Sequence, residues 1–120
     1  MNQKAKTVTY VPTEIREHLH SFAQANGYNL NPLYEKILLD FIEQKPYLKD
    51  KKCCFSKTQS WKARMGKAEW QQIGIYIHKD VFHKVQEASQ AIHLELLKKV
   101  SLMSFVCQAF IWHYELYNKK

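Results

Sequence analysis

The clearest alternation of apolar and polar residues in the chain is QQIGIYIH, residues 71–78, where every second residue after Gln71 is an isoleucine. Successive side chains of a β-strand point to opposite faces, so the three isoleucines share one face. The pattern predicts a strand that buries its isoleucines and exposes Gln72, Gly74 and Tyr76. A second, shorter β-branched run ends at Pro12, which lacks the N–H needed to continue a strand.

Helical spacing of apolar residues follows each run. In the first half, Pro12 or Thr13 opens a helix that ends at Gly27, a residue suited to a left-handed cap. A second helix is expected to begin with Asn31 as its N-cap and Pro32 at its first position, and to end at the next proline. The apolar stripes of these two helices are Ile15, Leu19, Phe22 and Ala23, and Leu33, Ile37, Leu38 and Phe41.

The second half repeats the first. Residues 73–92 align with residues 7–26 without a gap, and Tyr76 falls on Tyr10. A further helix follows, with Ser101 as its expected N-cap. The sequence of each half therefore predicts one strand followed by two helices.

The two halves differ in length between strand and second helix. From His78 to Ser101 there are 23 residues, against 19 from Pro12 to Asn31, and the surplus of four is about one helical turn. Either the third helix is longer than the first, or the fourth helix begins earlier, near Glu95.

A unit with one strand can neither pair that strand nor build a core alone, whereas two such units can. We therefore predict one domain, residues 1–120, mainly α with a small two-stranded antiparallel β-ribbon covered by four helices. Residues 6–44 form the first unit and residues 71–118 the second. Residues 45–70 form a linker without a clear period.

The net charge of +7 is concentrated in that linker. Residues 45–70 hold eight Lys/Arg and two Asp/Glu, whereas residues 1–44 sum to −1 and residues 71–120 to +2. A basic excess favours a polyanionic partner, most often nucleic acid. One interpretation is that cationic linker residues follow a DNA backbone; the other is a solvated connector whose tryptophans, Trp61 and Trp70, pack on the domain. The cations concerned are Lys57, Lys62, Arg64 and Lys67.

The sequence contains no recognisable catalytic or cofactor motif. Cys53, Cys54 and Cys107 suit neither a disulfide framework nor a zinc site, and three glycines are too few for a phosphate-binding loop. His18 and His20 lie two apart on a helix and point to different faces. No segment approaches the ~18 apolar residues of a membrane span, and the first ten residues lack the core of a signal peptide. We expect a cytoplasmic protein that is not an enzyme, binds no metal or cofactor and has no membrane partner.

The order of strand, proline, helix, Asn-Gly and helix resembles the ribbon–helix–helix DNA-binding proteins, which include the Arc and MetJ repressors. VPTEIREHLHSFAQANGYNLN, residues 11–31, is similar to the Arc segment that runs from its strand into its second helix. Most family members are homodimers. This chain resembles a tandem version with two ribbon–helix–helix units, as in accessory proteins of conjugative plasmid and T-DNA transfer. The resemblance implies binding of double-stranded DNA, with the ribbon in the major groove.

The resemblance also implies site residues. In the family, the residues two, four and six places before the proline point at base edges, and His78 replaces the proline in the second unit. Counted by burial alone, Val8 and Tyr10 would instead lie inside, with Thr7 and Thr9 outside. The family pattern gives Lys6, Val8 and Tyr10 in the first strand, and Gln72, Gly74 and Tyr76 in the second.

Lys6 and Gln72 suit hydrogen bonding to bases. Val8 and Gly74 depart from the Arg, Lys, Asn or Thr usual in family ribbons, so at these positions the ribbon would recognise shape or methyl groups. The second helix of each family unit clamps the DNA backbone, which assigns a phosphate contact to Asn31 and Ser101 beside their ordinary capping role.

By this resemblance the chain would act as a transcriptional repressor or as an accessory factor in plasmid or conjugative DNA transfer. Further partners would be a second copy on DNA and a relaxase or other transfer protein. The alternative is a protein-interaction module, an antitoxin or an inhibitor, that uses the same fold. The aromatic segment FIWHYELY, residues 110–117, is expected to supply core for the last helix and to leave some aromatic surface for another protein.

Overall fold

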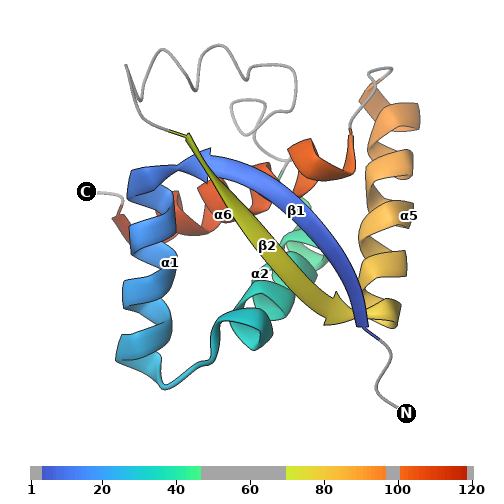
Figure 1. Ribbon diagram of the computed structural model, residues 1–120. Helices are drawn as coiled ribbons and strands as arrows, with labels where there is room; N and C mark the ends of the chain where they lie inside the picture. The colour runs from blue at the N-terminus through green and yellow to red at the C-terminus, as the bar shows by residue number, and fades with distance from the viewer. Residues whose placement is uncertain (1–3, 47–69, 97–100, 119–120) are drawn as a thin grey trace.

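The computed structural model describes residues 4–46, 70–96 and 101–118. These residues are mainly helical and contain one two-stranded antiparallel sheet, as predicted from the sequence. Figure 1 shows the arrangement of the elements. In chain order they are β1 (Lys4–Pro12), α1 (Thr13–Asn26), α2 (Leu30–Gln44), β2 (Trp70–His78), α5 (Lys79–Leu96) and α6 (Leu102–Asn118).

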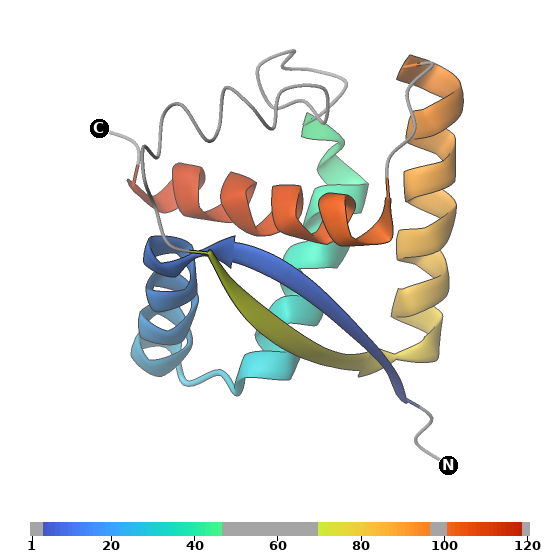
Figure 2. The ribbon, with the colours of Figure 1, turned by 45° about the horizontal axis from the view of Figure 1, so that its top comes forward.

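The two strands form a ribbon that lies over the helices. β1 and β2 pair along their whole length, from Lys4 opposite His78 to Pro12 opposite Trp70. In Figure 1 the ribbon crosses α2 and α6, and in both Figures 1 and 2 α1 and α5 stand near its two ends. The four helices of the described ranges lie on one side of the ribbon and leave its other face uncovered.

The ends of α1 follow the sequence prediction. Glu14 lies in its first turn, where the helix dipole favours a negative charge. Gly27 ends the helix in the left-handed conformation, with φ of 71°, and its N–H donates to the carbonyl oxygen of Ala23. A side chain at this φ would be strained, which explains the glycine.

The start of α2 differs from the prediction. The N-cap is Asn29, the helix begins at Leu30, and Pro32 is its third residue rather than its first. Either asparagine is an acceptable cap residue, and local sequence does not separate them. The side chain of Asn31 is used elsewhere, against the ribbon.

The first helix of the second unit, α5, is longer than its counterpart α1 in the first unit. α5 has 18 residues and α1 has 14, which accounts for one extra turn. Of the two starts that the sequence left open for the last helix, the structure shows the later one. α6 begins at Leu102, and the Ser101 hydroxyl before it accepts a hydrogen bond from Ser104 N–H at 3.1 Å. None of the helices in the described ranges is long and apolar enough to cross a membrane.

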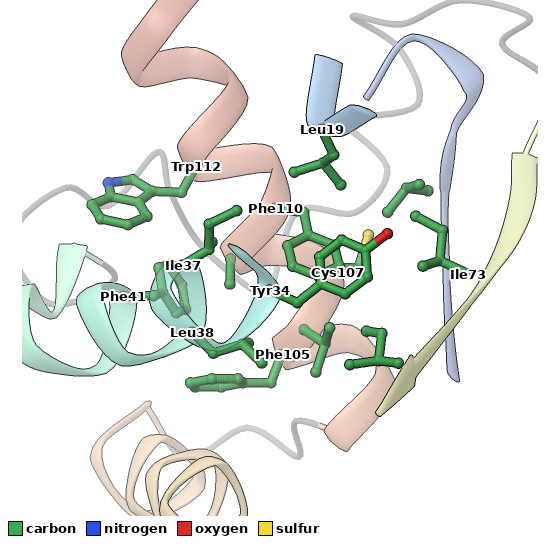
Figure 3. Close-up of a cluster of buried hydrophobic side chains, with 14 of the residues drawn as sticks. Leu19, Tyr34, Ile37, Leu38, Phe41, Ile73, Phe105, Cys107, Phe110 and Trp112 are labelled. Atoms are coloured by element: carbon green, nitrogen blue, oxygen red, sulfur yellow. The ribbon is translucent and has the colours of Figure 1, made fainter. Parts of the chain in front are cut away.

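One continuous core lies between the ribbon and the helices, and Figure 3 shows part of it. The three isoleucines of β2 are all buried, which confirms the predicted inner face. Apolar side chains of α2 and α6 belong to the same core, including Phe41 and Phe105, whose ring centroids are 5.2 Å apart. Burial raises the pKa of the Cys107 thiol to about 12, so this cysteine is a core residue and not a nucleophile at neutral pH.

Candidate nucleic-acid interface

The six ribbon residues predicted to contact bases are brought together as three cross-strand pairs. Their side chains lie on the face of the ribbon opposite the isoleucines; Val8 is half-buried and the other five residues are exposed. We call these six residues the outer face. The pairs are Lys6 with Tyr76, Val8 with Gly74, and Tyr10 with Gln72.

The orientation of β1 is settled by a buried threonine. Thr9 has no exposed surface, and its hydroxyl donates to the carbonyl oxygen of Met103 in α6 at 2.9 Å. A buried hydroxyl is tolerated when it is hydrogen-bonded. Tyr10 can therefore lie outside with 44% of its surface exposed, although it is the more apolar residue. Assigning β1 by hydrophobicity alone would have been wrong.

Each end of the outer face contains a contact between its two strands. Lys6 Nζ lies 5.5 Å from the ring centroid of Tyr76, a cation–π distance. At the other end the Tyr10 hydroxyl donates to Gln72 Oε1 at 3.5 Å, a long hydrogen bond. Neither contact stabilises the fold by much at an exposed site. Both limit the directions in which Lys6 and Gln72 point.

Two side chains of α2 accept hydrogen bonds from backbone N–H groups on the edge of β2 that does not pair with β1. Asn31 Oδ1 accepts a hydrogen bond from the N–H of Tyr76 at 3.1 Å, and Glu35 Oε2 accepts one from the N–H of His78 at 2.7 Å. The two residues are four apart and so lie on one face of the helix. They hold the start of α2 against the ribbon, so the Asn31 side chain serves the ribbon and does not cap the helix.

The charge around the outer face is uneven. Neither strand contains an acidic residue. At one end Lys4 is opposite His78, and Lys79 follows in the chain; all three are exposed. At the other end Pro12 is opposite Trp70, and neither side chain is charged. The two lysines of the ribbon, Lys4 and Lys6, therefore lie at the same end, where the carboxylates of Glu35 and Asp80 partly offset their charge.

A pair of imidazoles joins α1 to α6, and the sequence analysis missed it. His18 Nε2 and His113 Nδ1 are 3.0 Å apart, so one nitrogen donates a hydrogen bond to the other. The rings of Phe22 and Tyr117 each lie 4.7 Å from the ring of His113, centroid to centroid. Among the residues that the structure describes, no three His, Cys, Asp or Glu side chains gather as metal ligands would.

This pair makes stability depend on pH. Burial first, and then the neighbouring His18, lower the pKa of His113 to about 4, and burial also lowers the pKa of His18. Unfolding restores an ordinary value of 6.5, so below that pH the unfolded chain takes up protons that the folded chain excludes. The stability is therefore complete above pH 6.5 and is lost as the pH falls toward 4. With solvent screening of the half-buried His18 allowed for, we expect a loss of about 1–3 kcal/mol.

The measurement is urea denaturation at about pH 7 and about pH 4.5, which gives the free energy of unfolding at each pH. His113→Phe keeps a ring in the site but does not titrate, and it should reduce the difference between the two values. His20→Gln is the control, because His20 is exposed and outside this pair. If His113→Phe left the pH dependence as large as in the wild type, the pair would not be its source.

The remaining predicted site residues are placed as follows. Ser101 caps α6, two residues before Met103, whose carbonyl oxygen accepts the Thr9 hydroxyl. Asn31 adjoins the β2 edge of the ribbon. The linker cations Lys57, Lys62, Arg64 and Lys67 lie outside the described residues. Comparisons of the chain with protein-family models, with curated proteins and with solved structures found no match.

Proposed function

We propose that this chain is a double-stranded-DNA-binding protein built from two tandem ribbon–helix–helix units. The observation that carries the proposal is the outer face: a paired ribbon that the four described helices leave uncovered, with exposed hydrogen-bonding side chains and no acidic residue on either strand. The major groove is about 12 Å wide and admits a two-stranded ribbon whose strands are about 4.8 Å apart. The repeated order of strand, helix and helix supports the tandem assignment.

The outer face offers a different contact at each pair. The Lys6 ammonium donates hydrogen bonds, whereas the Gln72 amide both donates and accepts them. Both can reach base edges in the major groove. At the centre, Val8 offers methyl groups to thymine. A Cβ added at Gly74 would meet no protein atom within 4 Å, so this position is open on the outer side and lets DNA approach.

The starts of α2 and α6 would bind phosphates on either side of the groove. Helix N-termini carry unpaired N–H groups and partial positive charge. Asn31 Oδ1 is used by the ribbon, but its amide nitrogen still carries two donor hydrogens. The Ser101 oxygen accepts the capping hydrogen bond, and its hydroxyl hydrogen is a donor. Removing either side chain should weaken binding to all duplex sequences alike.

Duplex binding of this kind fits a transcriptional repressor or an accessory factor in plasmid or conjugative DNA transfer. In either role a second copy of the chain on adjacent DNA would be a partner. In the transfer role, a relaxase or other transfer protein would be another. Cytoplasmic location and the absence of an enzymatic activity belong to the same proposal.

Tyr76→Ala and Tyr10→Ala should each weaken specific DNA binding by ~1–3 kcal/mol, the range for one good base contact. Both side chains are exposed, at 45% and 44%, so neither change opens a cavity. The specific duplex is first selected from a random pool, and binding is then measured by fluorescence anisotropy. Thermal unfolding of each variant is the control and should change little. Normal binding by both variants would show that the ribbon does not contact the bases.

A second candidate is a protein-interaction module, and one observation favours it. Leu116 and Tyr117, at the end of α6, are 53% and 61% exposed, which is unusual for large apolar side chains. An antitoxin or inhibitor could bind its partner there. The random-pool selection separates the two candidates, because a module of this kind would enrich no duplex.

A further inference from the structure

The two ends of the outer face are chemically different although they occupy equivalent places. Val8 lies opposite Gly74 at the centre of the ribbon. Lys6 and Gln72 are each two residues before that centre on their own strands, and Tyr10 and Tyr76 are each two residues after it. The tyrosines therefore match each other, whereas a lysine at one end corresponds to a glutamine at the other.

The cross-strand contact also differs between the two ends of the outer face. Lys6 lies over the ring of Tyr76, and Gln72 accepts a hydrogen bond from Tyr10. An ammonium only donates, and it suits the paired acceptors O6 and N7 of guanine. An amide donates and accepts together, and it suits N7 and N6 of adenine.

The charge near the two ends of the outer face also differs. Three lysines (Lys4, Lys6 and Lys79) and two carboxylates (Glu35 and Asp80) lie at the Lys6 end, whereas Pro12 and Trp70 at the Gln72 end are uncharged. Positive charge attracts the DNA backbone without regard to sequence. The Lys6 end should therefore approach phosphates more closely than the Gln72 end, which adds a second difference to that between the bases recognised.

We infer that the chain recognises a non-palindromic duplex site in one orientation. A guanine lies under the Lys6–Tyr76 end and an adenine under the Tyr10–Gln72 end. Two identical strands would present the same groups at both ends and would select a palindrome. One chain with two different strands has no such constraint. This inference rests on the proposed function and specifies the symmetry and two of the bases of the DNA site that the outer face recognises.

The first test is the duplex selected from a random pool by the full chain, which should lack twofold symmetry. Two palindromes are then built, each from one half of that site repeated. The wild-type protein should bind the selected site about 5- to 150-fold more tightly than either palindrome, the ratio expected from one mismatched base contact.

Exchanging the two residues provides matched variants. Gln72→Lys places a lysine at both ends and should prefer the guanine palindrome, while Lys6→Gln should prefer the adenine palindrome. The double variant K6Q/Q72K again has one residue of each kind and should return to a non-palindromic site. Both positions are exposed, so thermal unfolding should be unchanged in all three proteins.

The outcomes separate this inference from the proposed function. A palindromic selected site would overturn the inference and leave DNA binding standing. Single variants that kept the wild-type preference would do the same, since the two residues would then not choose the bases. Enrichment of no duplex would contradict the proposed function and the inference with it.

Discussion

Ile75→Ala should lower the free energy of unfolding by about 2–5 kcal/mol, the usual cost of truncating a large buried aliphatic side chain to alanine. Ile75 is fully buried and lies in the middle of β2, opposite Thr7. Its side chain fills space between the ribbon and the helices below it. Those helices are held by their own contacts with one another, so we expect them to close the cavity only in part. Urea denaturation followed by circular dichroism gives the change directly.

Tyr76→Ala is the matched control, because Tyr76 is the next residue and points to the opposite face. Its side chain is 45% exposed, and the backbone N–H that donates to Asn31 is kept in the variant. We therefore expect little change in stability. If Tyr76→Ala unfolded the protein and Ile75→Ala did not, the two faces of the ribbon would be assigned the wrong way round.

The affinity for duplex DNA should fall about 250- to 4,000-fold when salt is raised from ~50 to ~200 mM. This corresponds to a slope of about −4 to −6 for log K against log salt, the value expected when four to seven phosphates are neutralised. Lys4 and Lys6 on the ribbon can supply part of that charge. The linker, with its net +6 over residues 45–70, can supply more.

Titration of a labelled duplex at several salt concentrations measures the slope. Neutralising Lys57, Lys62, Arg64 and Lys67 together should flatten it if the linker contacts DNA. An unchanged slope would assign the linker a connecting role alone. A wild-type affinity that did not respond to salt would contradict backbone contact of any kind, because counterion release accompanies every neutralised phosphate.

Periodicity determined most of the secondary structure without any tertiary information. The two-residue period of the isoleucines identified the strand within one residue of Trp70–His78 and its buried face. The helical stripes and Gly27 identified α1 and its end. The gapless alignment of the two halves implied that their strands pair. The strand, its buried face and α1 depend on contacts close in sequence, or on a burial pattern repeated along one element, so the sequence alone contains them. The pairing of the strands was expected because a single strand cannot satisfy its own backbone.

Three features were decided only by the tertiary structure, because each depends on a partner distant in the chain. The Thr9 hydroxyl donates a hydrogen bond to a carbonyl oxygen of α6, which allows Thr9 to be buried. Because adjacent residues of a strand point to opposite faces, Tyr10 then points outward. The Asn31 side chain accepts from the N–H of Tyr76 instead of capping α2, which begins directly after Asn29. His113, near the end of α6, meets His18 of α1 across 95 residues of sequence. A polar side chain has several acceptable partners, and only the folded arrangement of strands and helices selects one of them.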